Sequence, residues 1–298
     1  MAGLCKFRLC ALALIQIPNN WQPRPYQMDL WSYLENGGKR AVAVAHRRWG
    51  KDEIGLHWTA VSAMTKPAVY WHMLPIGTQA RKAIWTAVNP HTGRRRIDEA
   101  FPIEIRENTN DQEMFIRFKT GATWQVVGSD NYNALVGSPP YGLVFSEWAL
   151  ADPSAWAYLS PILQENGGWA LFIYTARGKN HGYSVYRTAQ RTEGWFAILQ
   201  TADDTGVFSP GELKAARQEY ISIYGEDEGE AVFQQEYHCS FDAAIMGAYY
   251  GKEIARLEKE KRIANVPYDP SLPVHTAWDL GLDDATAIWF IQIGGYEI

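Results

Sequence analysis

The residues best suited to chemistry lie in the segment AHRRWGKD, from Ala45 to Asp52. The apolar run Arg40–Ala45 precedes it, and a helix-like stretch follows it. This order of strand, Gly-Lys and helix is typical of a phosphate-binding loop, in which backbone N–H groups hold phosphates and Lys51 reaches the outermost one. Two positions depart from the usual G-x-x-x-x-G-K-[ST] pattern, because Ala45 replaces the first glycine and Asp52 replaces the Ser/Thr. A surface turn containing Gly-Lys is the alternative interpretation.

A second candidate is Glu147, which ends the apolar run Tyr141–Glu147. Beside a phosphate loop, this carboxylate could polarise the attacking water; without one it would be an ordinary surface residue. In additional-strand P-loop ATPases an Asp precedes this Glu and holds Mg²⁺ through water, whereas here Ser146 precedes it. The hydroxyl and the carboxylate are thus exchanged between loop and strand. Because Mg²⁺ prefers hard oxygen ligands, we predict that Asp52 and Ser146 together serve the metal.

Two weaker signals lie on either side of these segments. Gln27 precedes the first core strand, and its amide has both the donor and the acceptor that an adenine edge requires. Thr175, Ala176 and Arg177 end or follow the apolar run Trp169–Ala176, where a polar strand end could sense a γ-phosphate. Taken alone, Gln27 would be an ordinary polar residue, and Thr175–Arg177 an ordinary strand end.

The elements that must position these residues alternate between strands and helices, which predicts an α/β domain with a mostly parallel sheet. Further strands are expected at 68–75 and 169–176, a helix at 78–88 and a β-hairpin at 114–129. Asp152-Pro153 opens another helix-like segment, and residues 209–262 are largely helical and charged. We predict a P-loop ATPase domain over 1–240, a helical, Pro-containing linker over 241–270, and two strands of a second domain over 271–298.

Composition excludes several classes of protein. With 298 residues, 47% hydrophobic and 20% charged, the chain is globular rather than disordered. Its net charge of -5 leaves only local basic clusters as nucleic-acid candidates, namely Arg47–Arg48, Arg81–Lys82 and Arg94–Arg96. Three cysteines without a CxxC motif argue against a disulfide framework or a zinc site. The N-terminus lacks a cleavage site, and no apolar stretch reaches the ~20 residues of a membrane span, so a cytoplasmic protein beginning with a strand is expected.

Together these segments resemble the large terminase subunit of tailed bacteriophages, the motor that packages DNA into capsids. The resemblance covers nearly the whole chain from about Pro18 and rests on the ordered set of motifs. The matching segments are PYQ (25–27), HRRWGKD (46–52), LPIGTQARKAIW (74–85), LVGSPPYGLVFSEWAL (135–150), YTAR (174–177), CSFDAAIMGAYYGKE (239–253) and WDLGLDD (278–284).

The resemblance implies a role for each matching residue. Gln27 would recognise adenine, Lys51 and either Arg47 or Arg48 would bind the phosphates, and Glu147 would be the catalytic carboxylate. Thr175, Ala176 and Arg177 would couple hydrolysis to DNA movement. The other loop residues expected at the nucleotide are Ala45, His46, Trp49 and Gly50. It also implies ATP and Mg²⁺ as cofactors and double-stranded viral DNA, the portal protein of the procapsid and a small terminase subunit as partners. We expect a homo-oligomer in the bacterial host cytoplasm, transiently at the procapsid.

At the C-terminus, Asp279 matches the first metal-binding aspartate of an RNase H-like nuclease domain that uses Mg²⁺ or Mn²⁺. Asp283 and Asp284 are interpreted as part of the turn between strands. One aspartate cannot assemble a two-metal site, so we expect this chain, ending at Ile298, to be an ATPase with a truncated nuclease domain that does not cleave DNA. Two alternatives stay open: a helicase-like P-loop ATPase, and a packaging-associated binding protein that does not hydrolyse ATP.

Overall fold

A computed structural model describes residues 5–9, 13–135, 137, 139–242, 253–254, 256–257, 260–263, 265, 267–280 and 286–294. The chain forms two compact units, Met1–Ala248 and Tyr249–Ile298. The domain boundaries expected after residues 240 and 270 stay predictions.

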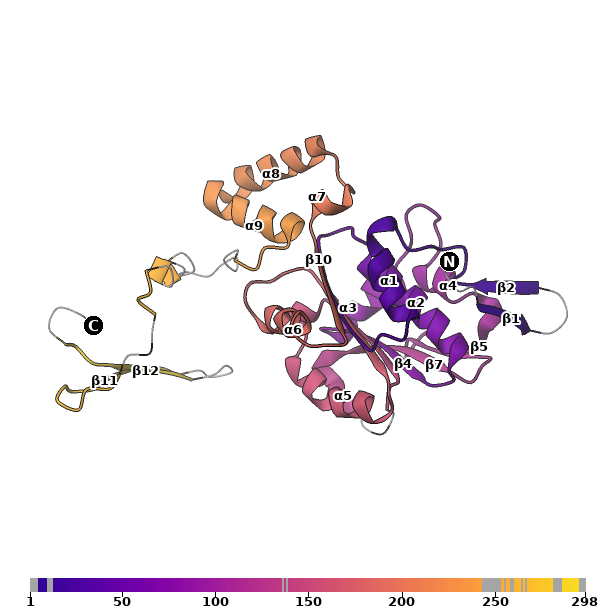
Figure 1. The fold of residues 1–298 in the computed structure, drawn as a ribbon, viewed down its shortest axis with the longest axis horizontal. Coiled ribbons are helices and arrows are strands. Elements are labelled where there is room, and N and C mark those ends of the chain that lie inside the picture. Colours follow the sequence, from indigo (N-terminus) through magenta and orange to yellow (C-terminus); the bar gives the residue numbers. More distant parts are fainter. Residues whose placement is uncertain are drawn as a thin grey trace. The chain divides into compact units, whose positions relative to one another are not determined.

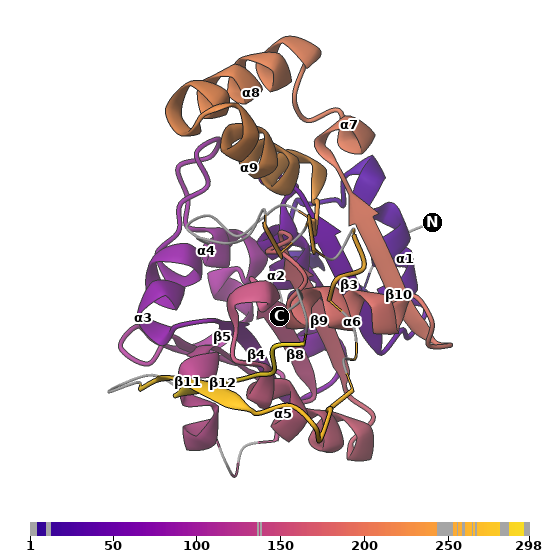
Figure 2. The same ribbon diagram turned by 90° about the vertical axis from the view of Figure 1, so that its left-hand side faces the viewer.

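The first unit is built on an eight-stranded sheet with the order β10-β3-β9-β8-β4-β7-β6-β5 (Figures 1 and 2). Strands β10 to β7 in this order pair in parallel, and β6 alone runs in the opposite direction, antiparallel to both β7 and β5. The predicted α/β fold with a mostly parallel sheet is therefore confirmed, and β9 lies between β3 and β8. The strands are β3 (Arg40–Ala45), β4 (Val69–Leu74), β5 (Arg106–Asn110), β6 (Phe115–Phe118), β7 (Thr123–Gly128), β8 (Gly142–Ser146), β9 (Trp169–Tyr174) and β10 (Trp195–Gln200).

Helices cover both faces of this sheet, which explains why its central strands are continuous apolar runs. In β3, Ala41 and Ala43 belong to one core cluster, whereas Val42 and Val44 belong to the cluster on the opposite face. The first cluster includes residues of α1 (Met28–Glu35), α2 (Lys51–Thr65) and α4 (Arg96–Ala100). The second includes residues of α5 (Pro153–Glu165) and α6 (His181–Ala189), which lie on the other side of the sheet in Figure 1.

The loop between β3 and α2 depends on a glycine with a left-handed backbone. Gly50 has φ 89°, and a Cβ at this position would lie 2.8 Å from Nη1 of Arg24. Any other residue would therefore have a strained backbone and would displace the end of the Arg24 side chain. Asp52 and Glu53 occupy the first turn of α2, where negative charge interacts favourably with the helix dipole.

A pair of helices follows the last strand of the sheet and lies beside the loop between β3 and α2. After α7 (Ala202–Thr205), α8 (Pro210–Tyr224) begins with a capping box between Ser209 and Glu212, and α9 (Glu226–His238) follows directly. The N–H of Arg47 donates to the carbonyl of Glu236 (3.2 Å), so α9 contacts the loop itself. The expected helical stretch is confirmed over 210–238, and most of 243–262 lies outside the described residues.

Several elements differ from the sequence-based expectations. The helix expected over 78–88 is shorter, because α3 (Gly77–Ala80) continues only as a π-helical turn, η2 (Arg81–Trp85). The N-terminus contains two antiparallel strands, β1 (Cys5–Leu9) and β2 (Ala13–Ile17), instead of one. Short 3-10 helices complete the unit: η1 (Pro25–Gln27), η3 (Ile103–Ile105), η4 (Ser129–Leu135) and η5 (Trp148–Leu150).

In the second unit, β11 (His275–Asp279) and β12 (Ala287–Ile291) form an antiparallel pair in which Asp279 lies opposite Ala287. The two strands expected here are confirmed, while Asp283 and Asp284 lie outside the described residues. Across the described part of the chain, no helix has the length and apolar character needed to cross a membrane.

Candidate nucleotide-binding site

The predicted site residues converge at the carboxyl ends of β3, β8 and β9. These ends carry the loop from His46 to Gly50, Glu147, and Thr175, respectively. Because the three strands are parallel, their carboxyl ends point in the same direction, and α/β proteins bind ligands beyond these ends. We call this end of the sheet the loop end.

Lys51 lies at the centre of the loop. Its ammonium donates to the carbonyls of Ala45 (3.2 Å) and His46 (3.3 Å) and to the hydroxyl of Thr175 (2.9 Å). Thr175 in turn donates to the carbonyl of Ala45 (3.1 Å). All three acceptors of the ammonium are neutral oxygens, so a negatively charged phosphate would be a stronger partner. The loop and the segment after β9 are therefore in direct contact.

Asp52 and Ser146 are in direct contact, as the exchange of hydroxyl and carboxylate requires. The hydroxyl of Ser146 donates to Oδ1 of Asp52 (2.7 Å), although the residues are 94 positions apart. Burial favours a higher pKa for Asp52, but hydrogen bonds from His72 and Ser146 outweigh it and lower the pKa. A carboxylate and a hydroxyl at the start of α2 are hard oxygen donors, so this pair fits a Mg²⁺ ion.

His72 is a third member of this group that sequence reasoning missed. It lies within β4, is fully buried, and its Nε2 is 3.1 Å from Oδ1 of Asp52. Its Nδ1 has no hydrogen-bond partner among the described residues. A buried nitrogen without a partner costs about 1–3 kcal/mol. The available signal was a histidine inside the otherwise apolar run VYWHML.

Glu147 follows β8 with a left-handed backbone (φ 52°, ψ 45°), a conformation that is rare for residues other than glycine. It is half-buried, and it is also the N-cap of η5. Such conformations persist where surrounding contacts enforce them, and they are concentrated at functional sites. The backbone geometry is consistent with a carboxylate held at the loop end.

Glu236 is a second functional candidate that sequence reasoning missed. Its carboxylate forms ion pairs with both Arg47 and Arg177, and the Glu236 side chain is only 7% exposed. Burial raises the pKa of Glu236, but the two arginines outweigh this effect and lower the pKa. Burial lowers the pKa of Arg47, but Glu236 and Glu147 outweigh it and raise the pKa. One carboxylate from α9 thus joins the loop to the predicted coupling segment, over a sequence distance that no local pattern reveals.

Gln27 supports the loop from the side of η1. Its buried amide donates to the carbonyls of Trp49 (2.9 Å) and Gly50 (3.4 Å) and accepts from the N–H of Arg24 (3.0 Å). In these contacts Gln27 orients the loop backbone, and its role toward adenine stays a prediction. Arg48 is exposed beside it, with a left-handed backbone of φ 71°.

His46 is buried and forms contacts within the loop end. Its Nε2 is 2.8 Å from the hydroxyl of Thr205, and its Nδ1 contacts the carbonyl of Arg47. Burial is the largest effect and lowers the pKa of His46 to about 4, so the ring is neutral at pH 7. Trp49 is also buried, and its indole N–H donates to Gln200 of β10.

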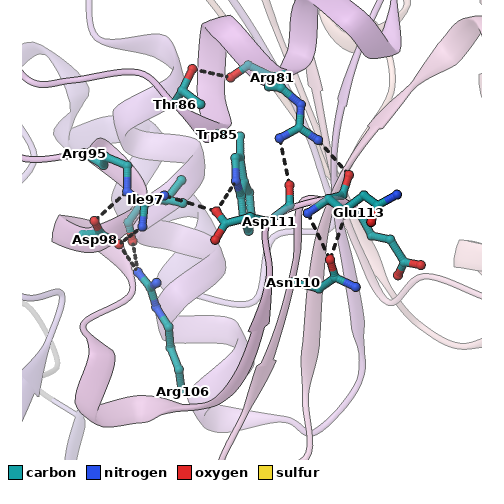
Figure 3. Close-up of polar contacts among 11 residues, drawn as sticks. Arg81, Trp85, Thr86, Arg95, Ile97, Asp98, Arg106, Asn110, Asp111 and Glu113 are labelled. Atoms are coloured by element: carbon teal, nitrogen blue, oxygen red, sulfur yellow. Dashed lines mark hydrogen bonds and ion pairs between the residues drawn. The ribbon is translucent and has the colours of Figure 1, made fainter.

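The remaining basic clusters are largely engaged within the protein. Arg81 donates to the carbonyls of Asp111 (2.8 Å) and Gln112 (2.7 Å), and Arg96 pairs with Glu53 (3.1 Å). Figure 3 shows a network on the flank of the sheet, here called the flank network. Its members are Arg81, Trp85, Arg95, Asp98, Arg106 and Asp111. Arg94 is exposed.

Asp279 lies at the end of β11 and is exposed. Among the residues that the structure describes, no group of three or more His, Cys, Asp or Glu side chains could hold a metal ion. The role expected of Asp279 therefore stays a prediction.

Comparisons with known proteins identify similar folds rather than similar sequences. No protein-family model matches the sequence, and no curated protein matches it either. The large terminase ATPase domain of Thermus phage P74-26 matches with a TM-score of 0.54 and 19% identity, covering 74% of this chain and 100% of that chain.

The large terminase of a second thermophilic bacteriophage, solved with ADP, matches with a TM-score of 0.57 and 14% identity. That match covers 92% of this chain, which spans 65% of the phage protein. The same phage protein solved with ATP-gamma-S matches with a TM-score of 0.56, 15% identity and coverage of 90% and 64%. The chain therefore has the fold of the ATPase domain of phage large terminases.

Proposed function

We propose that this chain is the ATP-hydrolysing part of a motor that packages double-stranded viral DNA, as a large terminase subunit. The observation that carries the proposal is the position of Lys51. Its ammonium lies among three neutral oxygens of the loop and of Thr175, at the carboxyl ends of β3 and β9. The similar large terminase of the thermophilic bacteriophage has been solved with ADP and with ATP-gamma-S, which supports ATP as the ligand.

Each residue of the loop end would have its own role in ATP hydrolysis. Lys51 and the N-terminus of α2 would neutralise the β- and γ-phosphates of ATP. Glu147 would orient and polarise the water that attacks the γ-phosphate. Arg47 would exchange its ion pair with Glu236 for the γ-phosphate, and Thr175 would sense whether that phosphate is present. Asp52 and Ser146 would hold Mg²⁺, which when bound would offset the negative charge of the phosphates.

The partners and location of the motor are part of the same proposal. We propose double-stranded viral DNA as the substrate that is moved, and the portal protein of the procapsid and a small terminase subunit as partners. The working form would be a homo-oligomer in the bacterial cytoplasm, docked at the procapsid during packaging.

We further propose that the strands β11 and β12 begin an RNase H-like nuclease domain in which Asp279 binds Mg²⁺ or Mn²⁺. A two-metal site needs several carboxylates, and within the described residues Asp279 belongs to no such group. The purified chain should therefore not nick supercoiled DNA in Mg²⁺ or Mn²⁺. Metal-dependent nicking would contradict this part of the proposal.

A binding protein without hydrolytic activity is the second candidate, because Ala45 and Asp52 depart from the usual loop pattern. Titration with a fluorescent ATP analogue tests nucleotide binding directly. Saturable binding should be lost in Lys51→Met and kept in Lys214→Met, which removes an exposed lysine of α8. Absence of saturable binding by the unmodified chain would contradict the proposed function, and binding without turnover would favour the second candidate.

A further inference from the structure

His72 occupies a position that packing alone does not explain. Its ring is fully buried on the face of β4 that meets α2, and β4 pairs with β7 and β8 on its two sides. Its Nδ1 is among the buried nitrogens without a hydrogen-bond partner in the described part of the chain. A buried polar atom without a partner lowers stability, so an apolar side chain would suit the core better. The contact that the histidine does make is therefore the feature to explain.

That contact is with Asp52, in the first turn of the helix α2 that packs against β4. Gly55 lies three residues after Asp52 in α2, where a Cβ would be 3.1 Å from Cγ1 of Val144 and 3.5 Å from Cε1 of His72. Glycine inside a helix is more unfavourable than any residue except proline. At this position, however, it lets the helix lie close to Val144 of β8, and a Cβ would make only an ordinary van der Waals contact with the imidazole. The Nε2 of His72 lies 3.1 Å from Oδ1 of Asp52 in the first turn of this helix.

The two donors around Asp52 converge on the same oxygen atom. Ser146 Oγ donates to Oδ1 at 2.7 Å, and the Nε2–H of His72 also points to Oδ1, because a carboxylate oxygen can only accept. Among the described residues no hydrogen bond involves Oδ2. The Asp52 side chain is 25% exposed, so the carboxylate is accessible from outside the core. Two fixed donors on one oxygen hold the plane of the carboxylate and leave the other oxygen for a ligand.

We infer that His72 is a positioning residue that, together with Ser146, holds Asp52 so that its Oδ2 serves the Mg²⁺ of bound nucleotide. The inference rests on the proposed nucleotide-binding function and deepens it. Hydrogen bonds from second-layer residues orient metal-binding side chains, and their loss weakens metal binding by about 10- to 100-fold. His72 itself touches neither nucleotide nor metal, so its effect is on the Mg²⁺ response rather than on phosphate binding by Lys51.

The test measures binding of ADP that carries a fluorophore on its ribose, first in excess EDTA and then at rising MgCl₂ concentration. In the unmodified chain Mg²⁺ should tighten binding, and the half-saturating Mg²⁺ concentration is the readout. The dissociation constant in EDTA reports whether the loop and Lys51 are intact. Thermal unfolding of the nucleotide-free protein reports the stability of each variant.

Two amide variants form a matched pair. In His72→Gln the amide nitrogen is as many bonds from Cα as Nε2, so the donor to Asp52 can be kept. In His72→Asn the amide is one bond shorter and cannot reach. We expect His72→Gln to keep the half-saturating Mg²⁺ concentration within about threefold, and His72→Asn to raise it about tenfold or more. The dissociation constant in EDTA should stay unchanged in both.

His72→Phe separates positioning from packing. It keeps a ring in the core and removes the unpartnered nitrogen, so the thermal midpoint should stay the same or rise while the Mg²⁺ response falls as in His72→Asn. A purely structural histidine would instead show a lower midpoint and equally weakened ADP binding with and without Mg²⁺. That result, or an unchanged Mg²⁺ response in all three variants, would overturn the inference.

The unmodified chain distinguishes failure of the inference from failure of the proposed function. If it binds no ADP at all, the proposed function is wrong and the inference falls with it. If it binds ADP and Mg²⁺ has no effect, nucleotide binding stands and the role assigned to Asp52, Ser146 and His72 is overturned.

Discussion

The loop end and the flank network both contain arginine-carboxylate pairs, but they join very different parts of the chain. In the flank network Arg95 and Arg106 reach Asp98, which is 3 and 8 positions away (Figure 3). At the loop end Glu236 reaches Arg47 and Arg177, which are 189 and 59 positions away. The local pairs join α4 to the edge strand β5. The distant pairs gather charge from three elements at a place where phosphate would bind.

The two sets of ion pairs should therefore differ in what their loss changes, which is either the stability of the fold or the affinity for a ligand. Arg106 is buried, and its partners lie within ten residues of it in the sequence. Replacing Arg106 should therefore lower the stability of the fold. The Arg47 side chain is 61% exposed, and its partner Glu236 also pairs with Arg177. Because exposed ion pairs add little to stability, changes to these residues should mainly alter ligand affinity.

Among the variants that test this division between the two regions, the largest effect is expected at Asp52 and Ser146. Asp52→Thr or Ser146→Asp alone should lower the steady-state ATP hydrolysis rate about 100-fold, since each leaves two like groups at the Mg²⁺ position. The double variant restores one hydroxyl and one carboxylate and should recover most of that loss. A double variant as slow as either single variant would contradict the exchange of hydroxyl and carboxylate.

Arg106→Met should lower the free energy of unfolding by about 2–3 kcal/mol, measured by urea denaturation. The Arg106 side chain is 3% exposed and donates to the carbonyls of Phe101 (2.7 Å) and Ile97 (2.9 Å) as well as to Asp98. The exposed Arg94→Met is the control, with an expected change within about 0.5 kcal/mol. ADP affinity should be unchanged in the folded Arg106→Met variant, and a weaker affinity would break the division between the two regions.

Glu236→Gln should tighten ATP binding by about five- to tenfold at low salt. The change removes a negative charge beside the phosphate position and frees Arg47 and Arg177, and added salt should reduce the gain. Glu230→Gln is the control, because Glu230 lies on the same helix and pairs with Arg217. Weaker ATP binding by Glu236→Gln at low salt would show that the pairs with Glu236 build the site rather than compete with phosphate.

A smaller effect concerns acid stability. Burial lowers the pKa of His57 to about 3, so between this value and about 6.5 the unfolded chain binds a proton that the folded chain does not. The free energy of unfolding should therefore fall as pH falls through this window, by up to about 1.4 kcal/mol per pH unit from this group. Nε2 of His57 is 3.8 Å from Glu53, whose charge would reduce the effect.

His57→Phe keeps the stacking on Trp21, whose ring is 4.4 Å from that of His57, and removes the titration. Urea unfolding at pH 7, 6 and 5 should show a slope shallower by about 1 kcal/mol per pH unit in the variant. His46, with its pKa of about 4, contributes in the same direction in both proteins. Identical slopes would contradict a buried neutral His57.

The central sheet could be predicted from the sequence because its strands are buried on both faces and read as apolar runs. The pairing of Asp52 with Ser146 could also be predicted, since both lie beside recognisable apolar segments. In contrast, β5 has the sequence RENTN and lies at the sheet edge, so it carries no apolar pattern. Glu236 was missed because its partners are distant in sequence, and His72 because it is hidden inside a strand.

The most direct test of an ATPase at the loop end compares ATP hydrolysis by the unmodified chain with hydrolysis by Glu147→Gln at saturating ATP and Mg²⁺. The variant keeps the size of the side chain and the contacts of Lys51 but cannot act as a general base. We expect ATP affinity within about threefold of the unmodified chain and a hydrolysis rate lower by about 10²- to 10⁴-fold. Equal rates in the two proteins, or no hydrolysis by an unmodified chain that binds ATP, would contradict the assignment.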